Sequence, residues 1–319
     1  MLLMEKIISI TAQNVCRLDE LLRKKIPELI KKEISNSKIR RLIVAGAVEV
    51  NKKQCRIPGY ELQEGAAVKL HLDEDKLFFE KTPDDIAFEV TEKSVLFEDE
   101  NIIVVNKPSF FPTEAGMVGS RDNLHAAVIR YLHGKNPALR NPPYAGVMHR
   151  LDRETSGVIL FTKSRSVNAP CHDMFEKHTA RKVYQAVVCA DRMNKKISEK
   201  NFTVRMFMGR ISAKSQAAKW GSVSESKGGV DSVTEFSVLK QIELSGKKYF
   251  LVEARPLTGR THQIRVHLAS VGLPILGDEL YGGKTFRRIM LHACRLSFPH
   301  PVTGENMTVS CEFSDLSVK

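Results

Sequence analysis

The stretch HRLDRETSGVILFTK, residues 149–163, is the most informative part of this 319-residue chain. Its second half, residues 157–163, is a nearly continuous apolar run of the kind that forms a buried strand. Its first half is a polar turn that holds two arginines, two acidic residues and two hydroxyl side chains. Such a turn can be a connector in which Asp152 or Thr155 bonds its own backbone. The concentration of charged and hydroxyl groups favours a chemical role instead.

A second polar stretch, RPLTGRTHQIRVHLA at residues 255–269, has the pattern of a helix that follows a loop. Thr261 is the expected N-cap, and Gly272 the expected end of the helix. Arg265 then lies in the first turns, where it needs either solvent or a carboxylate. Because a buried arginine without a partner is costly, Asp152 is an attractive partner for it.

Short strands and hairpins dominate the chain from about residue 93 onward. Hairpins are expected over residues 95–107 and 233–254, buried strands over 157–163 and 182–190, and a last strand over 307–313. Few helical segments separate these strands. The pattern predicts an α+β fold with a mixed, largely antiparallel β-sheet, and it argues against a doubly wound parallel sheet.

The first part of the chain predicts a small helical and β module. Apolar residues recur at helical spacing in two segments, and residues 48–50 and 67–72 alternate as short strands. Lys38, Arg40 and Arg41 are expected on the outward face of the second helix. An ordinary solvated helix face is the alternative interpretation. The scarcity of acidic residues around these three favours a surface that contacts phosphates.

The charge of the chain, +12 in total, is unevenly distributed. Residues 17–59 contain 12 basic and 5 acidic residues, whereas residues 61–100 contain 4 basic and 13 acidic residues. Beyond residue 100 the chain is strongly basic again. Two basic blocks separated by an acidic span are typical of two modules that face a polyanion.

Several classes of protein are excluded by the sequence. The six cysteines form no CxxC pair, which argues against a disulfide framework and a cysteine-ligated zinc site. Residues 277–285 lack the glycine spacing of a phosphate-binding P-loop. His262 and His267 are five residues apart and would point in different directions, so a shared metal is not expected. Neither a metal nor a cofactor is predicted.

The sequence also gives an expectation for the location of the protein in the cell. No apolar run approaches the ~18 residues that a membrane-spanning helix needs, and the N-terminus lacks the layout of a signal peptide. We therefore expect a cytoplasmic protein without a membrane partner.

Together these motifs resemble the RluA-type RNA pseudouridine synthases. HRLDRETSG, KVYQAVV, RPLTGRTHQIRVHLA and GLPILGDELYG occur in that family's order, between about residues 93 and 313. The segment 17–72 resembles the αL RNA-binding module, first seen in a small-subunit ribosomal protein, that often precedes such domains. The resemblance implies an αL RNA-binding module over 15–75, an acidic linker over 76–92 and a pseudouridine synthase catalytic domain over 93–319.

Site residues follow from the resemblance position by position. It makes Asp152 the catalytic aspartate, Tyr184 the ring that stacks on the target base, and Arg265 the cation that pairs with the aspartate. Arg150 matches the arginine that helps to take the target nucleotide out of the base stack. One segment departs from the family pattern, because NKPSFFPTE at residues 106–114 has two phenylalanines where a small residue and glycine are usual. Substrate contacts of that loop are therefore not carried over.

The reaction implied is isomerisation, in which uracil is detached from its ribose, rotated and re-attached through carbon 5. It needs no net oxidation, no nucleotide and no metal. An ionised Asp152 beside a guanidinium suits attack on the ribose, attack on the base or abstraction of a ribose proton, and the sequence leaves these routes open. Three histidines are interpreted as structural hydrogen-bonding groups and not as acid–base groups: His149, His262 and His267.

The expected partner is RNA, which must present the target base by extrusion at a cost of a few kcal/mol. The resemblance favours large-subunit ribosomal RNA, with transfer RNA as the alternative target, and a monomeric enzyme. Two other functions use some of the same residues. A nucleoside hydrolase would want a second carboxylate, for which Glu154 is the near neighbour. A catalytically silent RNA-binding protein would be expected to lack Asp152 or Tyr184, and both are present.

Overall fold

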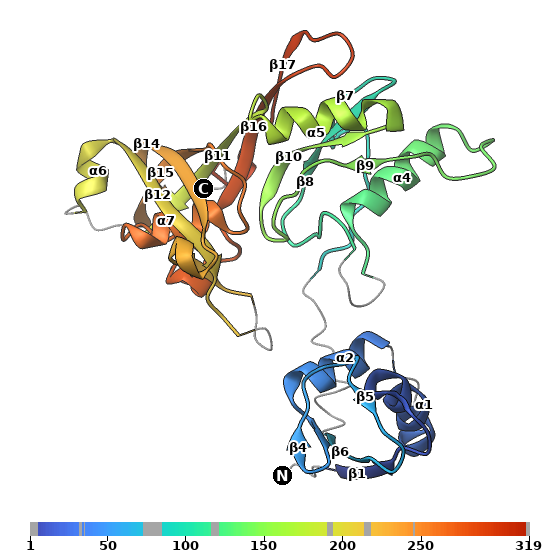
Figure 1. Ribbon diagram of the computed structural model, residues 1–319. Coiled ribbons are helices and arrows are strands. Elements are labelled where there is room, and N and C mark those ends of the chain that lie inside the picture. Colours follow the sequence, from blue (N-terminus) through green and yellow to red (C-terminus); the bar gives the residue numbers. More distant parts are fainter. Residues whose placement is uncertain are drawn as a thin grey trace. The chain divides into compact units, whose positions relative to one another are not determined.

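The computed structural model describes residues 6–31, 34, 36–72, 85–115, 121–189, 194–213, 218–244 and 246–316. Contacts divide the chain into two units, Met1–Pro83 and Asp84–Lys319, which are described separately below (Figure 1). The linker expected over 76–92 lies partly outside the described residues. Its last part belongs to the second unit, since Asp85 forms ion pairs with Arg121 and Arg153.

The first unit packs two helices and short strands around one core. Its elements are β1 (Lys6–Thr11), β2 (Cys16–Arg17), α1 (Leu18–Ile30), α2 (Asn36–Ala45), β3 (Val48–Val50), β4 (Lys53–Gln54), β5 (Glu61–Leu62) and β6 (Ala67–Leu72). Every fourth residue of α1 from Leu18 to Ile30 is buried, and Ile39 and Ile43 of α2 join the same core. The two predicted helices are confirmed. Strand β1, which the sequence analysis did not anticipate, pairs antiparallel with β6 along its whole length.

The second unit is built on one long, mixed sheet. Its strands are β7 (Val95–Glu98), β8 (Ile102–Lys107), β9 (Gly146–Val147), β10 (Ser156–Thr162), β11 (Arg181–Val188), β12 (Asn201–Arg210), β13 (Trp220–Ser222), β14 (Val230–Leu244), β15 (Lys247–Pro256), β16 (Leu291–Pro299) and β17 (Asn306–Ser310). Its helices are α4 (Leu124–Lys135), α5 (Asn168–Glu176), α6 (Lys195–Glu199) and α7 (Gln263–Ser270). Among the described strands only β10 and β16 pair in parallel, so the prediction of a largely antiparallel sheet in an α+β fold is confirmed.

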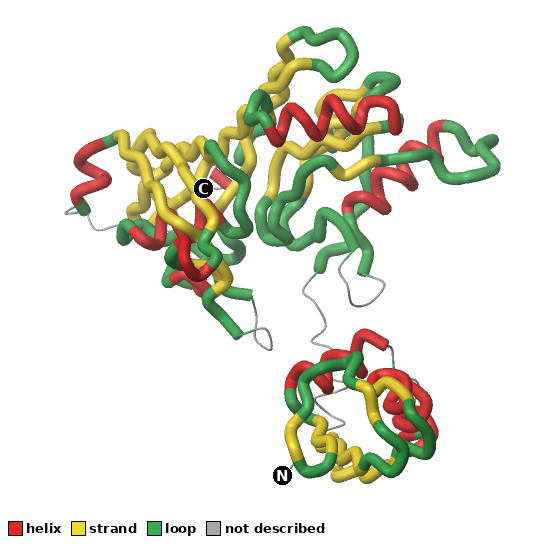
Figure 2. Tube along the Cα trace, in the orientation of Figure 1, coloured by secondary structure: helices red, strands yellow, loops and turns green. Residues whose placement is uncertain are grey.

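Two helices cover the opposite faces of strands β8 and β10 (Figures 1 and 2). Because side chains alternate along a strand, Ile103 and Val105 face one core and Ile102 and Val104 face another. Helix α4 contributes to the first core and α5 to the second. Burial on both faces explains why the middle of β10, residues 158–161, is an unbroken apolar run.

Helix α7 begins one residue later than the sequence predicts. Thr261 is not its N-cap; that position belongs to His262, whose backbone is left-handed with φ of 57°. The side chain of His262 forms no capping hydrogen bond, so the start of the helix has no N-cap signature in the sequence. The side chain of Gln263, the first helical residue, accepts hydrogen bonds from the N–H of Arg260 and the hydroxyl of Thr258, and so fixes the loop before the helix.

The two halves of the long sheet meet where β10 pairs with β16. This parallel seam has only two paired positions, Ser156↔His292 and Gly157↔Ala293. Ala293 also faces Tyr184 of β11, so Gly157, Ala293 and Tyr184 stand in one row across three strands. The strands approach so closely that a Cβ on Gly157 would lie 2.2 Å from the carbonyl oxygen of Ala293, and φ of Gly157 is 120°.

Replacement of Gly157 by alanine is therefore expected to lower the free energy of unfolding by about 2–5 kcal/mol, from the backbone conformation and the clash together. Gly228 is the matched control, because it also has a positive φ, 83°, but no neighbour within 4 Å of an added Cβ. Gly228→Ala should cost only about 1 kcal/mol. Chemical denaturation of both variants measures the difference, and equal losses would contradict the close approach at the seam.

Candidate active site

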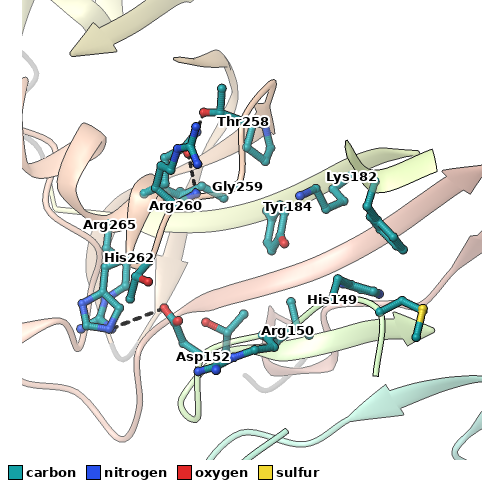
Figure 3. A pocket seen from close by; sticks show the side chains of 18 of the residues that line it. His149, Arg150, Asp152, Lys182, Tyr184, Thr258, Gly259, Arg260, His262 and Arg265 are labelled. Carbon is teal, nitrogen blue, oxygen red and sulfur yellow. Dashed lines mark hydrogen bonds and ion pairs between the residues drawn. The ribbon is translucent and has the colours of Figure 1, made fainter. Parts of the chain in front are cut away.

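A cleft of about 900 Å³ lies in the second unit, where the seam meets α7 (Figure 3). Three segments form most of its wall: the turn before β10, the strand β11, and the loop that leads from β15 into α7. These segments carry the two polar stretches that the sequence analysis singled out. The fold therefore brings together residues about 110 positions apart in the chain.

Asp152 lies in the turn before β10, with 27% of its side chain exposed. The turn is closed by backbone atoms, because the N–H of Thr155 donates to the carbonyl of Asp152 at 3.1 Å. The hydroxyl of Thr113 donates to the carbonyl of Leu151 at 2.8 Å and fixes the residue before it. Since backbone groups hold the turn, the Asp152 carboxylate is left to face the cleft.

A buried lysine supports this turn from below. The Lys107 ammonium donates to the carbonyls of Pro108, Phe111 and Arg153, and so ties the end of β8 to the Asp152 turn. Its side chain is fully buried, and burial lowers the pKa of Lys107 to about 7. The segment that begins with Lys107 and Pro108 therefore has a structural role in this chain, although its next residues differ from the family pattern.

Arg265 on α7 is shared by two carboxylates. Its Nη1 lies 3.6 Å from Oδ2 of Asp152, and its Nε and Nη2 donate to Asp278 at 2.7 and 2.8 Å. Both Arg265 and Asp278 are buried. Burial alone would lower the pKa of Arg265, but the hydrogen bonds to Asp278 and the charges of Asp278, Asp152 and Glu154 together outweigh it, and the pKa is raised. The expected Arg265–Asp152 pair is present, while the stronger partner, Asp278, was not anticipated.

His262 and Tyr281 complete the polar group around Asp152. The Tyr281 oxygen accepts from the N–H of Trp220 at 3.0 Å and forms a hydrogen bond of 2.9 Å with Nδ1 of His262. The other ring nitrogen of His262, Nε2, lies 3.9 Å from Oδ2 of Asp152. Burial lowers the pKa of His262. The sequence analysis left this histidine out of the site, and the structure places it there.

Tyr184 stands on β11 and also lines the cleft, with 8% of the residue exposed. A β-bulge between Val183 and Tyr184 shifts the register against β16 at this point, a device that re-aims a side chain. Figure 3 shows the Tyr184 ring and the Asp152 carboxylate in the same cleft, the first on a strand and the second on the turn before β10. Burial and the charge of Asp152 raise the pKa of Tyr184, so its hydroxyl stays protonated at neutral pH.

Arg150 lies at the rim of the cleft and is largely exposed, at 72% of its side chain. It forms an ion pair with Glu114 at 2.8 Å. Glu154, the nearest second carboxylate in sequence, is bound to Arg153 at 3.0 Å and does not line the cleft. Arg265, Asp152, Tyr184 and Arg150 are thus brought together.

The remaining predicted residues lie in the first unit, on α2. Arg40 lines a small groove between α1 and α2 together with Arg17 and Arg23, and its Nε is 3.8 Å from Asp19. Lys38 is half-buried. The side chain of Arg41 lies outside the described residues.

One group of side chains has the spacing of metal ligands. His172, Asp173 and Glu176 of α5 place their ligand atoms within 4.8 Å of one another, and all three are exposed. Asp173 is already paired with Lys177 at 2.6 Å. Exposed acidic groups are common without an ion, and this group gives no further indication of one.

Among the described residues, no helix is long and apolar enough to cross a membrane.

Comparison with known proteins gives two family matches. Residues 101–270 match the RNA pseudouridylate synthase family, and residues 16–68 match the S4 domain. The uncharacterised RNA pseudouridine synthase YhcT of Bacillus subtilis is 35% identical over 230 residues, which is 70% of each chain. The ribosomal large subunit pseudouridine synthase C of Pasteurella multocida is 33% identical over 293 residues, or 88% of this chain and 82% of the relative.

Solved structures give the same fold. Human RNA pseudouridylate synthase domain containing 1 is similar with a TM-score of 0.55 and 23% identity, covering 70% of this chain and 86% of that chain. At that identity the likeness concerns the fold of the second unit. The N-terminal S4 match confirms the predicted RNA-binding module.

Asp278→Asn should strongly destabilise the protein, because it leaves the buried Arg265 guanidinium without its bidentate partner. Breaking a buried ion pair on one side costs about 3–5 kcal/mol. Asp231→Asn is the control, since it removes the exposed, bidentate partner of Arg205 and should leave the denaturation midpoint unchanged. Chemical denaturation reports both changes; a midpoint for Asp278→Asn equal to that of the wild type would show that the pair is not structural.

Proposed function

The chain belongs to the RNA pseudouridylate synthase family, and we propose that it isomerises uridine in large-subunit ribosomal RNA with Asp152 as the catalytic group. The observation that carries the proposal is the position of Asp152. Its carboxylate faces the cleft, half-buried, with the Arg265 guanidinium 3.6 Å away. A cation at this distance can pair with the carboxylate and orient it, and a carboxylate in such a cleft can act as a nucleophile or a base.

The surroundings of Asp152 suit an isomerisation, in which the product contains the same atoms as the substrate. The bond between N1 of uracil and the ribose breaks, the base turns, and a bond from the ribose to carbon 5 forms in its place. Carbon 5 loses its proton and N1 gains one. Asp152 acts on the ribose or on the base, and both routes require an ionised carboxylate. The base has to stay in the site between the two bond changes, and the buried ring of Tyr184 gives it a flat surface to rest against.

Access to the base requires extrusion of the target nucleotide, because a stacked uridine hides its glycosidic bond. Arg150 is the group we assign to this step. It is two residues from Asp152, lies at the rim of the cleft, and among the described residues is bound only to Glu114, at the surface. An exposed ion pair of this kind is worth about 0–1 kcal/mol, so an RNA phosphate or base can displace Glu114 at little cost.

The substrate assignment rests on the relatives. The ribosomal large subunit synthases C and D of Pasteurella multocida match 88% and 91% of this chain, including both units. Pseudouridine mapping across the transcriptome, in cells with and without the gene, tests it directly. Loss of pseudouridines in large-subunit ribosomal RNA supports the proposal. Loss confined to transfer RNA would show that transfer RNA is the substrate of the same reaction.

Asp152→Asn is expected to abolish isomerisation and to leave RNA affinity within a few-fold of the wild type, because it removes the charge but keeps the shape. RNA tritiated at carbon 5 of uracil provides the measurement. Tritium release without free uracil indicates isomerisation, free uracil indicates hydrolysis, and neither indicates binding alone. Full turnover by the verified variant would remove Asp152 from the mechanism.

The N-terminal S4 domain is the part we assign to RNA affinity. Three arginines line its groove, namely Arg17, Arg23 and Arg40, and two acidic side chains stand beside them. Phosphate contacts of this kind add affinity without reading sequence. The acidic residues keep the arginines in place until RNA is bound.

The double variant Arg23→Gln, Arg40→Gln should weaken RNA binding and flatten its dependence on salt. Each lost phosphate contact reduces the slope of log K against log salt by about 0.7–0.9. Lys52→Gln, Lys69→Gln is the matched control, because it removes the same charge from exposed positions outside the groove. Binding titrations at several salt concentrations measure both; equal slopes for the two double variants would show that the groove does not contact RNA.

A further inference from the structure

Lys182 lies in the cleft and has no part in the chemistry described so far. It stands on β11 two residues before Tyr184, and both side chains line the cleft. Figure 3 shows Lys182 beside the Tyr184 ring, on the side of the cleft that Gly259 also borders. A Cβ built on Gly259 would lie 3.5 Å from the Lys182 ammonium, which places that charge next to the loop before α7.

This lysine differs from the arginines of the cleft in having no partner among the described residues. Arg265 has two carboxylates, Arg150 has Glu114, and Arg260 donates to the backbone carbonyl of Asp231. For Lys182 the described part of the chain shows neither a hydrogen bond nor an ion pair, although its side chain is half-buried. Burial lowers the pKa of Lys182, and no nearby carboxylate opposes that effect. A cation left in this position favours an anion that comes with the ligand.

His149 lines the same cleft and adds a second donor. Its Nε2 accepts a hydrogen bond from the N–H of Leu160 at 3.0 Å, so a neutral ring carries its hydrogen on Nδ1. Burial and the neighbouring charge of Lys182 lower the pKa of His149 to about 3, which keeps the ring neutral. The ring also packs on Phe175, with centroids 4.5 Å apart, and so has a fixed orientation. Within the described residues its Nδ1 has no acceptor.

We propose that Lys182 and His149 form a subsite for one backbone phosphate of the substrate RNA, next to the extruded uridine. A phosphodiester offers only acceptors and a negative charge, and these two side chains offer only donors and a positive charge. Lys182 is a point charge with three rotatable donors, whereas the His149 donor has a fixed direction. The subsite would hold the backbone while Tyr184 and Asp152 handle the base. The proposal rests on the proposed function, since RNA is the ligand.

The experiment is a double-mutant cycle between the protein and single linkages of the RNA. The probe is a short ribosomal RNA stem-loop with one uridine that the wild-type protein modifies, prepared with one neutral methylphosphonate at each linkage in turn around that uridine. For the wild type, one linkage should lower kcat/KM by about 10- to 100-fold, as expected for a lost charged hydrogen bond. Lys182→Met should show the same loss on unmodified RNA, and no further loss with that methylphosphonate.

Two further variants make the result specific. Lys182→Arg keeps the charge and should keep the sensitivity to the same linkage. Lys177→Met removes an exposed, ion-paired lysine outside the cleft and should behave as wild type on every RNA. Thermal unfolding of each variant shows whether it is folded. Two results would overturn the proposal. In one, the losses of kcat/KM from Lys182→Met and from the methylphosphonate multiply; in the other, the wild type shows no loss with a methylphosphonate at any linkage.

Binding measurements test the phosphate subsite independently of the proposed function. Affinities for a uridine heptamer, with and without single methylphosphonates, are measured for the wild type and Lys182→Met. If the wild type releases no tritium from any RNA, the proposed function fails, and the heptamers still decide whether Lys182 contacts a phosphate. Inhibition by inorganic phosphate that Lys182→Met abolishes, without any linkage effect, would mean that the subsite takes a free anion and not the RNA backbone.

Discussion

The site depends on one guanidinium that serves two carboxylates. Arg265 is buried, and a buried cation is tolerated only when it is paired and hydrogen-bonded. Asp278 satisfies Nε and Nη2, and this leaves Nη1 directed at Asp152. The two carboxylates therefore have different roles. Asp278 compensates the cost of burying Arg265, while Asp152 remains half-exposed in the cleft and available to react.

Much of the fold could be predicted because it follows from local patterns. The apolar run at 158–161 is the middle of a strand buried on both faces, and the hairpins appear where turn residues separate alternating segments. Arg265 could be assigned an acidic partner because its helical setting left it little access to water. Asp152, Tyr184 and Arg150 entered through a long, specific resemblance. The roles of these residues stay predictions, although the structure places them around one cleft.

What could not be predicted is non-local. Asp278 and Tyr281 belong to the GDELYG motif, yet nothing in that motif says that its acid binds Arg265 or that its tyrosine orients His262. Strand β1 is short, and only its pairing with β6 identifies it. The start of α7 was placed one residue too early because its N-cap, His262, forms no side-chain capping hydrogen bond that a sequence pattern would reveal. The absence of a counter-charge beside Lys182 depends on every segment around it.

The shortness of the parallel seam affects how the two halves of the sheet are joined. Strands β8 and β10 share six paired positions and β14 and β15 share ten, but β10 and β16 share two. Both hydrophobic cores continue across this seam, from β8 and β10 to β16. Beside the cleft, side-chain packing therefore joins the two halves more than backbone hydrogen bonding does.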